Sequence, residues 1–190
     1  MARPHGSTNS AQYYFQGQPS GLYVTSYGRM EASSSTDVAA ALTTQVMTAV
    51  ALFLEVGDKV TSLSFLSGAT AASVPTNWWF ALYDTAATPA LLGQTADQAT
   101  AAWAANTVKT LPLVTAYTAT VTGIYYAVCM VKATTVPSLI AKVAATAAAN
   151  GSILSSKVVA QTSGAALVAT APATLAAPTT VVNQLWAAAT

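Results

Sequence analysis

Two adjacent tryptophans in the stretch 74-VPTNWWFALYD-84 constrain the fold of this chain more than any other feature. Successive side chains of a β-strand point to opposite faces, so Trp78 faces one way and Trp79 the other. Phe80 then lies on the face of Trp78, and Tyr83 lies on the face of Trp79. One set can fill a core, whereas the other needs a second apolar surface, a ligand or another protein.

The surface of the chain has to be completed almost without charge. Charged residues make up 7% of the 190 residues, against about 25% in a typical soluble protein. The net charge is +1 and the seven basic residues are scattered, which excludes the basic stripe that nucleic-acid binding requires. A weakly self-repelling surface of Thr, Ser, Asn and Gln favours extended contact with other protein.

Three further classes of protein are disfavoured by the same inspection. The most apolar runs, 39–56 and 158–190, are broken by polar residues, glycine or proline, so neither is a membrane span of about 20 apolar residues. The start, MARPHGSTNS, lacks the apolar region of a secretory signal peptide. Cys129 is the only cysteine, which excludes an internal disulfide and a cysteine-based zinc site. We therefore expect synthesis in a cytoplasm.

Residues 1–37 differ in composition from the rest of the chain. They hold four of the ten glycines and many Ser, Gln and Asn residues, a composition that cannot bury a core of its own. Aromatic residues nevertheless stand among them, at Tyr13, Tyr14, Phe15, Tyr23 and Tyr27. The segment is predicted to be an extended arm that docks on another surface, with an undocked tag as the alternative.

From residue 38 onward the pattern predicts antiparallel β-strands. They are expected over 46–56, over 59–66, around the tryptophan pair, and over 90–94, 108–114 and 117–132. Residues 95–106 are predicted to form a loop with a helical turn, in which Thr95 caps and Trp103 anchors. Residues 137–157 suit either a short helix or an irregular loop. The remainder, from about residue 158, is predicted to be an extended tail with a last strand near 184–189.

A weak internal echo indicates how these strands are arranged. The run 59–66 precedes Trp78 and Trp79 much as the run 108–114 precedes Tyr125 and Tyr126. Each unit reads as a strand, a loop and a strand that carries an aromatic pair. Two such units stacked face to face predict a β-sandwich.

No arrangement of residues in the sequence points to catalysis. His5 is the only histidine and lies in the arm, so no Ser-His-Asp triad can be assembled. The acids stand apart except Glu55 and Asp58, which border a turn and are expected to cap it. Calcium on Asp84 or Asp97 is a minor alternative, because a lone Asp after a strand is usually a turn residue. We expect neither enzymatic activity nor a cofactor or metal.

The aromatic pairs leave three interpretations open. One member of each pair is core while the other is covered by long loops, or the outward members form a subunit interface, or they form a sugar platform. Trp and Tyr are enriched at the centre of interfaces and charge is depleted there, so the sparse charge favours the second. The interface candidates are Tyr13, Tyr14, Phe15, Tyr23, Trp79, Tyr83 and Tyr125.

Four stretches together resemble a group of small virion proteins from tailed phages of actinobacteria. They are 59-KVTSLSFLSGATA-71, 77-NWWFALYD-84, 91-LLGQTADQATAAWAANT-107 and 123-GIYYAVCMVKATTVPSL-139. The likeness covers about residues 45–140, extends weakly to 184-QLWAAAT-190 and leaves the arm outside it. Members of the group are called head-fibre, decoration or minor tail proteins. The resemblance implies a virion role and supplies no catalytic residues.

The expected fold is all-β. Residues 1–37 form an extended N-terminal arm, and residues 38–190 form an antiparallel, jelly-roll-like β-sandwich with an irregular C-terminal segment. The expected function is structural, as a capsid decoration or head-fibre protein on the virion surface. The alternatives are a minor tail protein and a host-glycan-binding adsorption module. The expected partners are copies of the chain in a homotrimer, by analogy with other decoration proteins, and the major capsid protein or other virion proteins.

Overall fold

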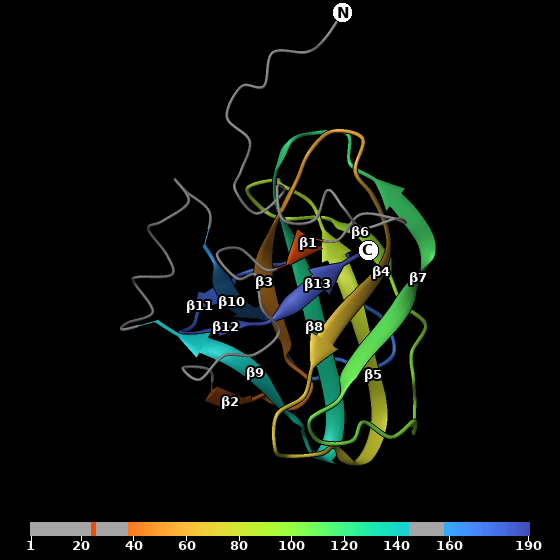
Figure 1. Cartoon of the computed structure of the whole chain (residues 1–190), viewed down its shortest axis with the longest axis vertical. Helices are drawn as coiled ribbons and strands as arrows, with labels where there is room; N and C mark the ends of the chain where they lie inside the picture. The colour runs from red at the N-terminus through yellow and green to blue at the C-terminus, as the bar shows by residue number, and fades with distance from the viewer. Residues whose placement is uncertain (1–23, 26–37, 145–157) are drawn as a thin grey trace, which may run out of the picture.

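The computed structural model describes residues 24–25, 38–144 and 158–190, and its regular elements are all strands (Figure 1). Every pairing between these strands is antiparallel. The expected all-β class is therefore confirmed. Over the described ranges no helix is long and apolar enough to cross a bilayer.

The strands form three sheets, in each of which consecutively named strands are hydrogen-bonded to one another. Sheet A contains β1 (Val24–Thr25), β13 (Ala187–Ala189), β4 (Lys59–Leu66) and β7 (Val108–Thr118). Sheet B contains β11 (Thr179–Thr180), β10 (Ala160–Ser163), β3 (Met47–Leu54), β8 (Gly123–Thr135), β5 (Ser73–Tyr83) and β6 (Leu91–Gln94). Sheet C contains β12 (Asn183–Leu185), β9 (Ser138–Val143) and β2 (Val38–Ala41).

Sheets A and C lie on the same side of sheet B, and in Figure 1 β4, β7 and β13 are drawn in front of β3, β8 and β5. Trp186 alone separates β12 from β13, and its backbone N–H donates to the carbonyl of Ile140 in β9 at 2.9 Å. The main core between the layers includes Leu52, Leu63, Phe65, Trp78, Phe80, Ala127, Leu139 and Leu185. This arrangement is a β-sandwich, whereas the jelly-roll topology is not confirmed.

Sheet B is buried on both faces, which explains the adjacent tryptophans. Trp78 and Phe80 point into the main core. Trp79 and Tyr83 point into a second cluster on the opposite face, which we call the outer core. Residues 164–178, which we call the strap, cover that face and contribute Leu167, Ala171 and Leu175 to it. The other side chains of the outer core are Met47, Ala49, Ala51, Ala81, Leu91, Ile124, Tyr126, Val128, Met130 and Val158.

The two predicted strand–loop–strand units interleave instead of stacking. β4 pairs with β7 in sheet A, and β5 pairs with β8 in sheet B. Each unit therefore places one strand in each sheet, and each strand finds its hydrogen-bonding partner in the other unit. The alternation of side chains predicted the faces of these strands but not their neighbours, because it carries no information about pairing.

The segment from about residue 158, predicted as an extended tail of the sandwich domain, contributes strands to two sheets. β10 pairs with β3, and β13 pairs with β4. Both pairings satisfy N–H and C=O groups that an edge strand would leave without partners. The last strand predicted near 184–189 corresponds to β12 and β13.

Two other local predictions need correction. Residues 95–107 form a loop without a helix, although Trp103 is buried as expected. The ambiguous segment 137–157 begins with a strand, β9, in place of either alternative. Its residues 145–157 lie outside the part of the chain that the structure describes.

Val74 is strained at an exposed position. Its φ of 48° lies in the left-handed region and it precedes Pro75, while its side chain is 67% exposed. We expect Val74→Asn to raise the free energy of unfolding by about 1 kcal/mol, because left-handed backbone costs a residue with a Cβ about 1–2 kcal/mol and Asn tolerates it best. Urea denaturation measures the change. Val114→Asn, at a 75% exposed residue without a positive φ, is the control and should stay within about 0.5 kcal/mol of the parent.

Candidate functional site

The aromatic residues predicted to form an interface are not on the surface. Trp79, Tyr83 and Tyr125 are 0%, 0% and 1% exposed within the single chain. These side chains have no accessible area in the single chain with its own strap in place, so the predicted exposed interface is wrong for these three residues in that arrangement. The candidates in the arm, which are Tyr13, Tyr14, Phe15 and Tyr23, lie outside the described residues.

Hydrogen bonds show what covers the three rings. The indole Nε1 of Trp79 donates to the carbonyl of Val168 at 2.6 Å, and the hydroxyl of Tyr83 donates to the carbonyl of Pro172 at 2.7 Å. Both acceptors belong to the strap. Tyr125 points into the main core, and its hydroxyl donates to the carbonyl of Val121 at 2.7 Å. The first interpretation, in which one member of each pair is core and the other is covered by a loop, is confirmed.

A sugar platform built on Trp79 is excluded by the same geometry. Stacking of a sugar needs an exposed ring face. All four tryptophans of the chain are buried; Trp78, Trp79, Trp103 and Trp186 are 1%, 0%, 0% and 3% exposed. The tryptophans therefore hold the fold together in the isolated chain.

Burial keeps several weak acids protonated. Desolvation raises the pKa of the Tyr83 phenol and of the Cys129 thiol far above their ordinary values. It also raises the pKa of Tyr126. For Tyr125, desolvation and the neighbouring Tyr117 raise the pKa to about 12.

We expect the chain to lose stability in alkali. The unfolded state releases protons from tyrosine and cysteine near their model values of 10.0 and 9.0, whereas the folded state retains them. The free energy of unfolding should therefore be constant with respect to these groups below about pH 8 and fall as the pH rises above about 9. Urea midpoints between about pH 7 and pH 11 measure the effect. The slope should be shallower in Tyr126→Phe; a rise in stability with pH would contradict the assignment.

The strap is the long loop of the hairpin formed by β10 and β11. Thr162 pairs with Thr179 where the hairpin closes. The loop folds back over one face of sheet B, where side chains from two separate parts of the chain donate hydrogen bonds to it. Gln45 donates from its Nε2 to the carbonyl of Leu167 at 3.1 Å, and Gln94 donates from its Nε2 to the carbonyl of Ala169 at 2.7 Å.

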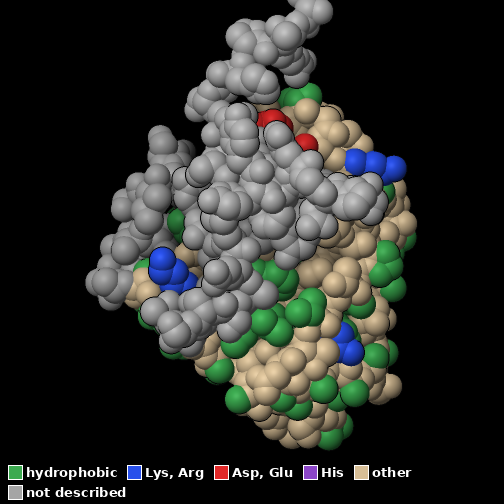
Figure 2. All heavy atoms as spheres, in the orientation of Figure 1, with side chains coloured by type: hydrophobic (Ala, Val, Ile, Leu, Met, Phe, Trp, Pro, Cys, Tyr) green, Lys and Arg blue, Asp and Glu red, His purple; other side chains and the backbone are tan. Residues whose placement is uncertain are grey.

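A second surface is formed by loops at one end of the sandwich, which is the lower end in Figure 1. We call this surface the loop end and define it as the exposed residues of segments 67–74 and 95–107. These residues are Ala69, Thr70, Ala71, Ser73, Val74, Ala96, Ala99, Thr100, Ala101, Ala102, Ala104 and Asn106. None of them is charged, and all but Asn106 are small or β-branched. In Figure 2 the lower part of the visible face is mostly green and tan.

The loop end is held rigidly by Trp103. Its ring stacks on Trp78 with the centroids 5.0 Å apart, and its Nε1 donates to the carbonyl of Thr107 at 3.2 Å. The two loops are joined by a bond from the Ala72 N–H to the Trp103 carbonyl at 2.9 Å. A further bond from the Ser67 hydroxyl to the Ala104 carbonyl measures 2.6 Å. The exposed small residues are therefore presented in a fixed arrangement.

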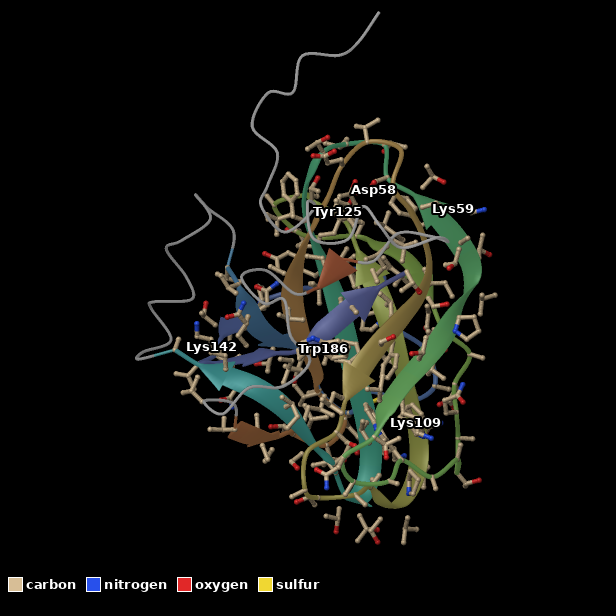
Figure 3. The ribbon with its side chains drawn as sticks, viewed as in Figure 1. Asp58, Lys59, Lys109, Tyr125, Lys142 and Trp186 are labelled. Carbon is tan, nitrogen blue, oxygen red and sulfur yellow. The ribbon has the colours of Figure 1, made fainter. Side chains whose placement is uncertain are left out.

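Carboxylates at both ends of the sandwich stabilise turns and strands through bonds to backbone N–H groups. Asp58, which Figure 3 places at the upper end, accepts from the backbone N–H of Glu55 at 2.8 Å, as the turn-capping prediction required. Asp84 accepts from the N–H of Ala90 at 2.8 Å. Asp97 accepts from the N–H of Trp78 at 2.9 Å. Over residues 24–25, 38–144 and 158–190, no group of three or more His, Cys, Asp and Glu residues could hold a metal ion.

Trp186 is a feature that the sequence did not single out. It lies between Leu185 and Ala187, which both belong to the main core, so its own side chain points away from that core. It is nevertheless 3% exposed (Figure 3). Its Nε1 is the one buried side-chain nitrogen or oxygen of the described residues that has no hydrogen-bond partner. The alternation of 184-QLWAAAT-190 was the signal that could have identified it.

Known proteins give no further guidance on these surfaces. No protein-family model matches the chain, and no curated protein or solved structure matches it either. Its function therefore has to be inferred from the geometry of the loop end, the strap and the covered face of sheet B.

Proposed function

We propose that this chain is a structural protein of a tailed-bacteriophage virion that decorates the capsid through protein–protein contacts. The observation that carries the proposal is the loop end, a rigid and uncharged surface of small residues. The resemblance of four sequence stretches to small virion proteins agrees with it. Decoration of a capsid requires durable contacts and no catalysis.

The composition of the loop end suits a durable contact. Burying Ala, Thr and Val residues removes no charge from water, so little free energy is lost in desolvation. The small side chains bring two main chains close together. Because Trp103 and Trp78 already hold the loops in place, binding also orders few additional groups and loses little entropy.

The proposed partners are the major capsid protein and further copies of this chain. The aromatic residues of the arm, residues 1–37, would be buried against a neighbour, while β1 of the arm pairs with β13 of its own chain. A homotrimer is proposed by analogy with other decoration proteins. Multi-angle light scattering of the full chain at micromolar concentration tests the trimer, and a monomer with the arm intact would contradict it.

Immunogold labelling of intact virions tests the location. Antibody against this chain should label the head over its whole surface when read by electron microscopy. Label confined to the tail or its tip would support the alternative of a minor tail protein. Unlabelled virions would contradict the virion role, provided that the antibody detects the purified chain. Antibody absorbed with the purified chain is the control for specificity.

The loop end can be tested directly by a charge. Ala102→Asp places a carboxylate on the loop end, and Ala116→Asp places one on an exposed residue of β7. We expect Ala102→Asp to reduce the chain bound per virion at least about tenfold, since a charge buried without a partner costs several kcal/mol. Ala116→Asp should bind as the parent does. Quantitative immunoblotting of purified virions measures both, and equal binding of the two variants would contradict the assignment.

A further inference from the structure

We propose that the outer face of sheet B is a binding surface for an extended segment of small residues, and that the strap of a second copy of this chain can occupy it. The inference deepens the proposed function and rests on it, because it names a contact through which copies associate. It starts from the chemistry by which the chain already holds its own strap.

The surface recognises main-chain atoms of an extended segment. Side chains of four residues, contributed by β5, β6 and the segment before β3, donate to strap carbonyls. Two of them belong to β5: Trp79 donates to Val168 and Tyr83 donates to Pro172. The other two are Gln45 and Gln94, which donate to Leu167 and Ala169. Gln94 also accepts from the N–H of Ala171 at 2.6 Å through its Oε1.

The apolar part of the surface accepts small side chains. Ala171 and Leu175 of the strap are 5% and 0% exposed and pack on the outer core. Pro172 presents its carbonyl without needing a hydrogen-bond acceptor for an N–H. Aromatic rings that carry donors are a recurring means of binding extended proline-containing segments. The surface is therefore suited to a peptide with the composition of the strap, 164-GAALVATAPATLAAP-178.

The return of the strap onto its own sheet requires left-handed backbone at both ends of the loop. Gly164 has a φ of 77°, and the alanines at 166 and 177 have φ values of 55° and 43°. Alanine is strained in this region, unlike glycine. A strap that extends to a neighbouring molecule is free to relax these two residues. The strap that packs on its own sheet therefore carries backbone strain at Ala166 and Ala177, which an exchanged strap need not carry.

Exchange between copies preserves the contacts that the strap makes with the outer face of sheet B, although the bond from the Ser163 hydroxyl of β10 to the Ala176 carbonyl joins the strap to its own hairpin. Each chain carries both the surface and the segment that occupies it, so two copies can satisfy one another with identical hydrogen bonds and packing. Such exchange of an identical element is a low-cost route to oligomers. The flanking strands β10 and β11 remain in their own sheet B, and only the strap between them binds to the other molecule.

Cysteine cross-linking distinguishes the two arrangements. Ala90 and Thr174 face each other in an antiparallel bridge between the strap and the segment before β6. The flanking bonds, from Leu91 to Ala173 and from Leu175 to Pro89, both measure 2.9 Å. They make this a non-hydrogen-bonded pair, whose short separation suits a disulfide. The native Cys129 is fully buried, so it should not compete.

The experiment mixes two variants of the full chain that each add one cysteine to the buried Cys129, Ala90→Cys and isotope-labelled Thr174→Cys, under mild oxidation. Exchange predicts a mixed disulfide between labelled and unlabelled chains, detected on a non-reducing gel and by mass spectrometry. Its yield should exceed that of Val114→Cys mixed with Thr174→Cys by at least about tenfold, since only a seated strap raises the effective thiol concentration. Val114 is 75% exposed and lies on β7, away from the strap.

Equal yields for the two mixtures, together with complete intrachain closure in the double variant Ala90→Cys/Thr174→Cys, would overturn the inference. A second measurement needs no substitution. Isotope-filtered nuclear Overhauser spectra of mixed labelled and unlabelled native chains should show contacts between the Trp79 indole and Val168 of different molecules, and their absence at high concentration would also overturn it. Immunogold labelling of the head would stand in either case, so failure of the inference is distinguishable from failure of the virion role.

Discussion

Replacing Trp79 with alanine should lower the free energy of unfolding by about 3–5 kcal/mol, the usual cost of removing a buried aromatic side chain. The ring is 0% exposed and packs in the outer core, so a cavity would remain between sheet B and the strap. The bond from its Nε1 to Val168 would be lost as well. Urea denaturation followed by circular dichroism measures the change, with the midpoint and the slope compared with those of the parent.

Trp79→Phe is the matched control for that experiment. It retains most of the apolar volume and removes the indole donor, so we expect a smaller loss, of about 1–3 kcal/mol. If Trp79→Ala instead unfolds like the parent but dissociates an oligomer, another subunit covers this face in solution. The chain's own strap would then not be its permanent cover.

Trp103→Ala should have an effect of similar size, again about 3–5 kcal/mol. Trp103 is 0% exposed, stacks on Trp78 and contacts Phe80 edge to face with the centroids 5.5 Å apart. It also anchors the loops of the loop end. Hydrogen exchange should therefore accelerate in residues 95–107 more than in β8, in addition to the loss of global stability measured by denaturation.

The matched control for this variant is Trp103→Phe, which keeps a ring against Trp78 but loses the donor to Thr107. We expect it to retain most of the stability and most of the protection of the loop. Equal exchange rates in the parent and in Trp103→Ala over residues 95–107 would show that the tryptophan does not hold this loop. In that case the rigid presentation of the loop end would need another cause.

The parts of the fold that follow from local alternation could be predicted from the sequence. Trp78 and Trp79 indicated a strand with two apolar faces, and the structure places them in the main core and the outer core. The strand predicted over 59–66 is β4 with the same bounds. The antiparallel all-β class followed from these patterns, because period-two alternation states which side chains share a face.

The cover of the second face could not be predicted in the same way. The bond between Trp79 and Val168 joins residues 89 positions apart, and nothing in a strand pattern specifies so distant a partner. The strap carries no motif, since it is composed of Ala, Gly, Leu, Pro, Thr and Val. Its low charge and proline content resemble those of an extended tail, and they do not indicate that the segment covers Trp79 and Tyr83.

The strap divides the tolerance of substitution unequally between the two partners of each hydrogen bond. Every strap atom in these bonds belongs to the main chain, whereas the atoms across from it belong largely to side chains, those of Gln45, Trp79, Tyr83 and Gln94. Mutation can therefore alter most strap side chains and leave the bonds intact. Among related sequences the four donors should therefore remain invariant, whereas the side chains of the strap should vary.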